Sequence, residues 1–241
     1  MQPQIVVPNY QGFHNQNPEE TNARLEKAKS YRDLSTIIIC PTRGVVPAKV
    51  VQSWMGLMRP MNQKVIGPLF AIGMEVGDAY TSMIAMILSN PDLANWKYIL
   101  TIEEDNMPPA DGLLKLYESM DTYDVVGGLY WTKGEGGQPM IYGDPNVQPL
   151  NFIPQIPQSE TVQETNGLGM GFHLFKMDIF KDERVPRPWF RTVQEIVPGQ
   201  GAKTYTQDLY FFENIRKLGY RVACDTRVKV GHYDYVNDIV W

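Results

Sequence analysis

The sequence of 241 residues has few cysteines and few histidines, and it carries no excess of positive charge. Its two cysteines, Cys40 and Cys224, each lie in an apolar run and not in a closely spaced metal-binding pair. We expect two buried, reduced thiols, although a bridge between them stays open. Lysine and arginine total 22 against 27 aspartates and glutamates, a net charge of −5. This balance argues against general binding of nucleic acids or anionic membranes.

The sequence also lacks a long apolar segment. No run approaches the roughly 18 residues of a membrane-spanning helix, and Met1–Gln4 has neither the basic nor the apolar part of a signal peptide. We therefore expect a cytoplasmic protein. Hydrophobic residues make up 43% and aromatic residues 11% of the chain, which is enough for a buried core and excludes wholesale disorder.

Residues 1–34 differ in amino-acid composition from the rest of the chain. They are polar and rich in asparagine, glutamine and glutamate, with a short charged helix expected at Glu19–Tyr31. We interpret residues 1–34 as an arm-like N-terminal extension and residues 35–241 as the domain proper.

From residue 35 onward, apolar runs that suit buried strands alternate with helical patterns. The expected strands are 35–40, 64–72, 96–102, 124–130 and 220–230, and the expected helices are 48–58, 76–88, 110–120 and 207–218. This alternation predicts a single α/β domain of Rossmann-like character, with a mainly parallel central sheet flanked by helices. Residues 133–163 lack periodicity, which is typical of a binding loop.

Three carboxylates, Glu103, Glu104 and Asp105, directly follow the strand expected at 96–102. In an open α/β sheet, ligands bind beyond the carboxyl ends of the strands. Crowded carboxylates repel one another unless a cation neutralises them. In an extended chain Glu103 and Asp105 point to the same side, which suits two oxygen ligands for Mg²⁺ or Mn²⁺. A solvated acidic turn is the plain alternative.

Three other strings carry candidate residues. Asp208 begins the helix at 207–218, where the plain interpretation is a helix cap. His232 closes the last expected strand, and a neutral imidazole is a good third ligand beside two carboxylates, although a lone histidine is more often structural. Pro41, Thr42 and Arg43 end the first strand, where the arginine suits a phosphate or a base edge, or is a surface charge.

Taken together, these strings resemble the GT-A fold glycosyltransferases and are similar to the family 2-like enzymes that use nucleotide-sugars. The resemblance spans about Ser35–Tyr233. Glu103–Pro109 resembles the DxD segment of the family, with glutamate in place of the first aspartate. Thr206–Phe211 resembles its Glu-Asp helix start, with glutamine in place of glutamate, and Leu218–Val222 and Val230–His232 resemble its closing strands.

The resemblance implies a metal-dependent, inverting glycosyltransferase. Glu103, Asp105 and His232 would hold Mn²⁺ or Mg²⁺, which neutralises the charge that grows on a nucleotide-diphosphate leaving group. Asp208 would deprotonate the acceptor hydroxyl, which then attacks the anomeric carbon from the opposite face. The sequence does not identify the acceptor that carries this hydroxyl.

The resemblance also implies binding residues for the donor, a UDP- or GDP-sugar. Pro41, Thr42, Arg43 and Glu104 would border its nucleotide. Gly169, in the glycine-rich segment 166–171, would let the backbone approach donor or acceptor closely.

Two other functions stay open at this point. One is a non-catalytic module that binds nucleotide-sugars or glycans on the same fold. The other is a sugar-phosphate nucleotidyltransferase, which is less favoured because Pro41–Gly44 is too short and too weakly basic to hold a triphosphate. Trp131 and Trp189 are candidate platforms for a sugar ring, or simply core aromatics.

Overall fold

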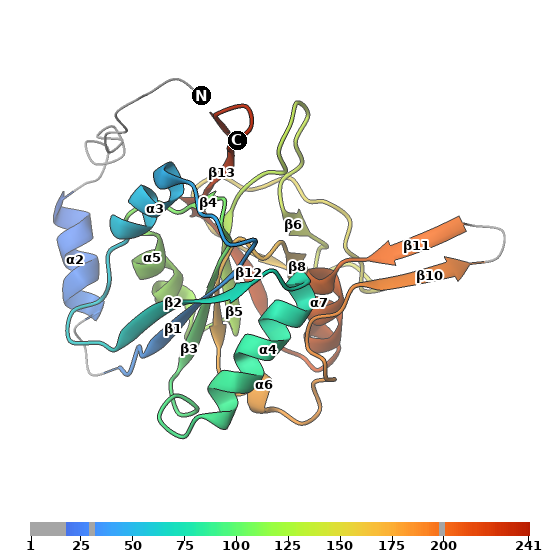
Figure 1. Ribbon diagram of the computed structural model, residues 1–241, viewed down its shortest axis with the longest axis horizontal. Coiled ribbons are helices and arrows are strands. Elements are labelled where there is room, and N and C mark those ends of the chain that lie inside the picture. Colours follow the sequence, from blue (N-terminus) through green and yellow to red (C-terminus); the bar gives the residue numbers. More distant parts are fainter. Residues whose placement is uncertain (1–17, 29–31, 198–200) are drawn as a thin grey trace.

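The computed structural model describes residues 18–28, 32–197 and 201–241, and a seven-stranded sheet lies at its centre (Figure 1). The strands are, in spatial order, β2 (Val65–Ile72), β1 (Thr36–Thr42), β3 (Tyr98–Ile102), β9 (Phe172–Lys176), β5 (Val125–Leu129), β12 (Val222–Lys229) and β7 (Val162–Thr165). The pairings give β2, β1, β3, β5 and β12 one direction, and β9 and β7 the other. The prediction of a mainly parallel α/β sheet is confirmed.

The sheet carries helices on both faces. The described helices are α2 (Pro18–Ala28), α3 (Ala48–Met55), α4 (Val76–Ser89), α5 (Gly112–Ser119), α6 (Asp178–Lys181) and α7 (Gln207–Lys217). The first strands and helices lie where the sequence predicts them, with their ends shifted by a few residues. None of the helices in the described ranges is long and apolar enough to cross a membrane.

Two hydrophobic cores explain this layering. Successive side chains of β1 point to opposite faces: Ile37 and Ile39 pack with α4, α6 and α7, whereas Ile38 and Cys40 pack with α5 and the end of α3. A strand that is buried on both faces must be apolar at every position, which is why its continuous β-branched run is predictive. Cys40 and Cys224 are both buried and free, as expected.

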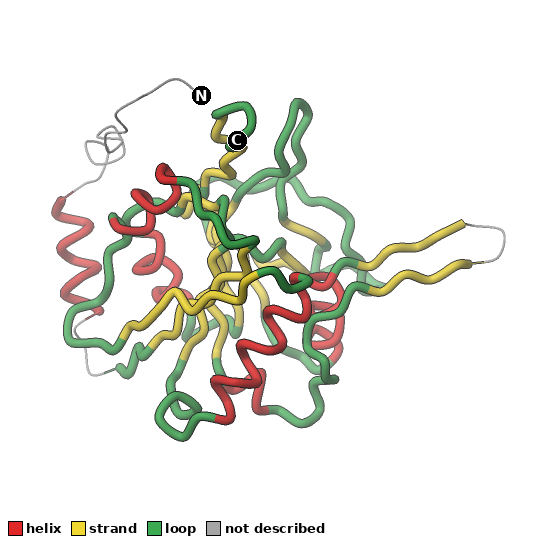
Figure 2. The backbone as a smooth tube through the Cα atoms, in the orientation of Figure 1, coloured by secondary structure: helices red, strands yellow, loops and turns green. Residues whose placement is uncertain are grey.

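Short strands form smaller sheets around the body. They are β4 (Asn106–Met107), β6 (Ile141–Tyr142), β8 (Gly167–Leu168), β10 (Val193–Val197), β11 (Gly201–Tyr205), β13 (Gly231–Asp234) and β14 (Ile239–Val240). The antiparallel hairpin of β10 and β11 projects from the body (Figure 2). β13 pairs with β4 on one side and with β14 on the other.

The N-terminal extension is described only in part. Helix α2 lies beside α5, where Arg24 pairs with Glu118 (2.7 Å between Nε and Oε1). Arg32 pairs with Asp121 just beyond α5. These contacts attach the described part of the extension to one flank of the body, near α5 in Figure 1. Residues 1–17 and 29–31, which complete the predicted extension, lie outside the described ranges.

Candidate functional site

The candidate residues gather where β1, β3 and β5 reach their carboxyl ends. Glu103, Glu104 and Asp105 follow β3 directly, and His232 belongs to β13, which pairs with β4 immediately after the acidic string. The string does not continue as an extended strand. It turns, because the Asn106 N–H donates to the Glu103 carbonyl at 3.0 Å. The expectation of an alternating extended segment is therefore wrong, and the three carboxylates point in three directions.

Asp105 faces His232 and Lys133. The Oδ2 atom of Asp105 lies 3.5 Å from His232 Nε2 and 2.5 Å from Lys133 Nζ. Burial opposes ionisation of Asp105, but hydrogen bonds from His232 and Lys133 outweigh it and lower its pKa. The other ring nitrogen of His232, Nδ1, lies 2.8 Å from the Trp131 carbonyl. Since a carbonyl only accepts, this bond assigns a proton to Nδ1.

Glu103 faces away from this pair into a buried environment. The Tyr80 hydroxyl of α4 donates to Glu103 Oε1 at 3.1 Å. Burial, together with the negative charge of Asp105, raises the pKa of Glu103 to about 7. Glu103, one of the three predicted metal ligands, is thus a carboxyl group whose pKa lies well above its ordinary value.

Glu104 fastens the end of β3 to the end of β1. Its Oε2 accepts from the Thr42 hydroxyl at 2.6 Å and from the Arg43 N–H at 2.8 Å, and its Oε1 accepts from Arg43 Nε at 2.5 Å. Burial opposes ionisation, but these bonds lower the pKa of Glu104. The structure therefore brings together four of the predicted nucleotide contacts, Pro41, Thr42, Arg43 and Glu104. The carboxylate of Glu104 is already hydrogen-bonded to Thr42 and Arg43.

Asp208 lies in the first turn of α7 and is 7% exposed. Its Oδ1 accepts from the Leu209 N–H at 2.9 Å. Burial raises the pKa of Asp208, against the opposing hydrogen bonds from Thr206 and Leu209. The negative charge of Asp208 contributes to the raised pKa of Glu103, Tyr130 and Tyr142. Asp208 is therefore a buried carboxyl group at the start of α7 and not a solvent-facing one.

Two residues that were predicted to contact the donor or a sugar ring belong to the hydrophobic core instead. Gly169 is buried, and a Cβ there would collide with the Tyr130 hydroxyl group and the Met140 methyl group. The side chains of Tyr130 and Met140 fill the space that the missing side chain of Gly169 leaves. Trp189 is 2% exposed and packs edge-on against Phe180, so it is a core aromatic and no sugar platform.

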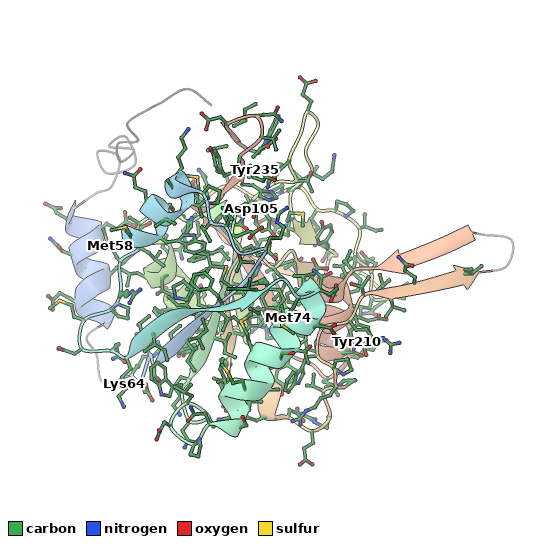
Figure 3. The ribbon with its side chains drawn as sticks, in the orientation of Figure 1. Met58, Lys64, Met74, Asp105, Tyr210 and Tyr235 are labelled. Atoms are coloured by element: carbon green, nitrogen blue, oxygen red, sulfur yellow. The ribbon has the colours of Figure 1, made fainter. Side chains whose placement is uncertain are left out.

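A pocket of about 620 Å³ opens beside Asp105. Its walls are mostly apolar, with Arg43, Lys49, Glu104 and Asp105 as its charged members, and the remaining lining residues are Val45, Val46, Pro47, Ala48, Tyr233 and Tyr235. Asp105 and Tyr235, which line this pocket together, are labelled one above the other in the upper half of Figure 3. The Arg43 guanidinium lies 5.9 Å from the centroid of the Tyr235 ring.

The predicted metal ligands are assembled in part. Asp105 and His232 approach each other, whereas Glu103 bonds Tyr80. Across the part of the chain that the structure describes, no three histidine, cysteine, aspartate or glutamate side chains are placed together as a metal site. The arrangement offers two converging donors and a third carboxyl group nearby.

No pattern in the sequence marks three other residues of this cluster as functional. Tyr80 is one aromatic of the apolar helix α4, and Tyr130 follows β5 with its hydroxyl bonded to the Gly171 N–H at 3.0 Å. Lys133 begins a glycine-rich loop, and only the placement of that loop beside β4 and β13 brings its ammonium group to Asp105. A lysine that precedes several glycines does not by itself predict a functional role, because the sequence does not show which residue it contacts.

Comparisons with known proteins bear on the fold alone. No family model matches the chain, and no curated protein matches it. Among solved structures, the crystal structure of A197 from STIV is similar, with 20% sequence identity and a TM-score of 0.57. The match covers 83% of this chain and 86% of that chain. At this identity the likeness shows that the two proteins share a fold, and it assigns no activity.

Proposed function

We propose that this protein is a metal-dependent glycosyltransferase of the GT-A fold. It moves a sugar from a UDP- or GDP-sugar to an acceptor hydroxyl, with inversion at the anomeric carbon. One observation carries the proposal: Asp105 and His232, which come from two separate segments of the chain, approach each other at the carboxyl edge of the sheet. Ligands bind at this edge in open α/β sheets. The carboxyl group of Asp208 is buried at the start of α7.

The pair of Asp105 and His232 fits a divalent cation. Two neighbouring ligands of one ion are typically about 3 Å apart, since each lies roughly 2.1 Å from it, and Asp105 Oδ2 and His232 Nε2 are 3.5 Å apart. Mg²⁺ is commonly held by only one or two protein groups together with substrate phosphates. When bound, the cation neutralises the charge that develops on the nucleotide diphosphate.

Asp208 suits the role of a catalytic base. The acceptor O–H loses its proton to the Asp208 carboxylate while its oxygen attacks the anomeric carbon, and the bond from that carbon to the diphosphate oxygen breaks. A base is more effective when its pKa is raised toward the working pH, and burial shifts the pKa of Asp208 in that direction.

The pocket beside Asp105 suits the nucleoside of the donor. Its apolar walls match the faces of a base and a ribose, and Tyr235 and Val45 are exposed enough to meet them. Arg43, which pairs with Glu104, and Lys49, which pairs with Asp238, are the cationic residues of this pocket and would face the phosphates. This arrangement supports Arg43 as a nucleotide contact while Glu104 holds the end of β1 in place.

A nucleotide-sugar hydrolysis assay tests the proposal. The purified protein is incubated with a panel of UDP- and GDP-sugars and Mn²⁺, and the release of UDP or GDP is measured by chromatography. We expect slow release from one donor, none with EDTA, and at least a tenfold loss in Asp105→Asn. The matched control is Asp178→Asn, which removes an exposed carboxylate that pairs with Lys181.

Other outcomes separate the alternatives. Tight donor binding without any release, with or without an acceptor library, would favour the non-catalytic binding module. Release of pyrophosphate from a nucleoside triphosphate and a sugar phosphate would favour the nucleotidyltransferase. A folded protein that neither binds nor cleaves any donor in the panel would contradict the proposal.

A further inference from the structure

The ammonium group of Lys133 occupies the position beside Asp105 where a cation is expected. Lys133 Nζ lies 2.5 Å from Asp105 Oδ2, and the same oxygen lies 3.5 Å from His232 Nε2. Both side chains of the ion pair are largely shielded from water, with exposed fractions of 28% for Lys133 and 17% for Asp105. One carboxylate oxygen is therefore shared by a lysine and a histidine in the absence of any ligand.

The segment that carries Lys133 is a tight turn with open space around its tip. Its base is closed by hydrogen bonds between Thr132 and Gln138, one from the Thr132 N–H to the Gln138 carbonyl and one from the Gln138 N–H to the Thr132 hydroxyl, both at 2.9 Å. Between them, Gly134 and Gly136 have φ values of 104° and 76°. Nothing lies within 4 Å of where their Cβ atoms would be. The two glycines thus leave open space beside the part of the turn that follows Lys133.

We propose that Lys133 is an exchangeable counter-ion, which neutralises Asp105 until a divalent cation takes its place and then transfers to the nucleotide diphosphate. This inference rests on the proposed function, because it assumes that Asp105 holds the cation. The two positive charges cannot share one oxygen at close range, since like charges repel. On leaving Asp105, the ammonium group would be held by the diphosphate that the cation brings to the site, and Asp234 is the other anion that Lys133 already influences.

The exchange predicts opposite effects on two affinities when the charge of Lys133 is removed. In Lys133→Met, Mn²⁺ alone no longer competes with the ammonium group, so its dissociation constant falls by about fivefold. With Mn²⁺ saturating, the diphosphate loses one positive partner, so the dissociation constant of UDP or GDP rises by about fivefold. A lysine with a purely structural role moves both affinities in the same direction or neither.

Mn²⁺ binding is measured by electron paramagnetic resonance of the free ion, and UDP and GDP binding by calorimetry. Lys229→Met is the matched control, because it removes an equal charge from the exposed pair of Lys229 and Glu160. The gain in Mn²⁺ affinity should vanish when Lys133→Met is combined with Asp105→Asn. Circular dichroism melts establish that each variant is folded.

The remaining outcomes each decide a point. Equal Mn²⁺ affinity in Lys133→Met and the unaltered protein, with Asp105→Asn still abolishing binding, would overturn the counter-ion exchange and leave the proposed function standing. Tighter Mn²⁺ binding with unchanged UDP and GDP affinity would overturn the transfer to the diphosphate. Mn²⁺ binding that is indifferent to Asp105→Asn would overturn the metal site itself, and with it both proposals.

Discussion

Burial governs the protonation of Glu103 and Asp208 more strongly than their position in the chain does. The start of a helix favours a charged aspartate, and the sequence alone predicts that Asp208 ionises readily there. In the structure Asp208 is buried, and its pKa is raised instead of lowered. Glu103 shows the same effect, with a pKa raised to about 7. The free energy lost when a carboxylate is removed from water exceeds the stabilisation that the helix N-terminus gives to its charge.

The raised pKa of Glu103 makes the stability of the protein depend on pH. An acid whose pKa is higher in the folded state stabilises that state only while it keeps its proton, so stability falls as pH rises from 4.5, its ordinary pKa, through 7. Glu103→Gln removes this effect and keeps an acceptor for the Tyr80 hydroxyl. We expect the variant to gain about 2 kcal/mol more at pH 8 than at pH 5.

Urea unfolding at both pH values with EDTA present measures this difference. Glu183→Gln, at an exposed glutamate, controls for the loss of one charge. A gain that is equal at pH 5 and pH 8 would show that Glu103 ionises normally.

Asp208→Asn separates a catalytic base from a helix cap. Asparagine caps a helix about as well as aspartate, so the free energy of unfolding should change little. An amide cannot accept the proton, so turnover should fall by ~10²-fold or more while donor affinity is retained. If Asp208 is the base, the acid limb of the turnover profile of the unaltered protein should lie above pH 3.8, the ordinary pKa of aspartate. Near-normal turnover in the variant would remove Asp208 as the base, and a retaining product would remove inversion.

At the scale of secondary-structure elements, local patterns predict what exists but not how it is placed. The alternation of apolar strands and amphipathic helices up to residue 130 is a local property, and the structure has those elements. The position of β9 is not local. Its sequence is that of a strand, yet it enters antiparallel between β3 and β5, because partners distant in the chain complete its hydrogen bonds.

The same limit explains the site. The resemblance implies Glu103, Asp105 and His232 as the ligands of one metal ion, and β4 and β13 bring two of them, Asp105 and His232, together. The sequence predicts an extended Glu103–Asp105 segment, whereas the chain turns there and directs Glu103 to Tyr80. Tertiary packing decides the partner of each carboxylate, and the spacing of residues in the sequence does not predict that packing.

The pairing of β5 and β9 depends on a glycine opposite a buried histidine. Gly127 is directly across from His173, whose ring occupies the space that a Cβ at Gly127 would need. Gly127→Ala should therefore cost about 1–3 kcal/mol of unfolding free energy through overpacking. In a His173→Ala background the ring is absent, and the same change should cost less than about 1 kcal/mol.

Denaturant unfolding of the two single variants and the double variant gives the coupling. Gly56→Ala is the control, because a Cβ there would meet only ordinary contacts of 3.4 Å and beyond. An equal cost of Gly127→Ala in both backgrounds would mean that the sheet avoids the collision by shifting.

At the scale of the whole molecule, the candidate site joins distant parts of the chain. Arg43 follows β1, Asp105 follows β3, Asp208 begins α7, and His232 lies in β13 near the end of the chain. A ligand that binds this site holds all of these segments in their folded positions and has no comparable site in the unfolded chain. Binding therefore stabilises the entire folded state by mass action.

This linkage gives a test that needs neither the donor sugar nor the acceptor. With Mn²⁺ present and UDP or GDP at ~100 times its dissociation constant, the folded state gains about 2.7 kcal/mol, which for a chain of this size raises the melting temperature by roughly 5–10 °C. With EDTA in place of Mn²⁺, or in Asp105→Asn, most of this increase should disappear, because the diphosphate loses its cation. Asp178→Asn, at an exposed aspartate, should keep it. An increase of the same size with and without Mn²⁺, and in Asp105→Asn, would mean that the nucleotide binds without a cation at Asp105, and the metal-dependent mechanism would have to be abandoned.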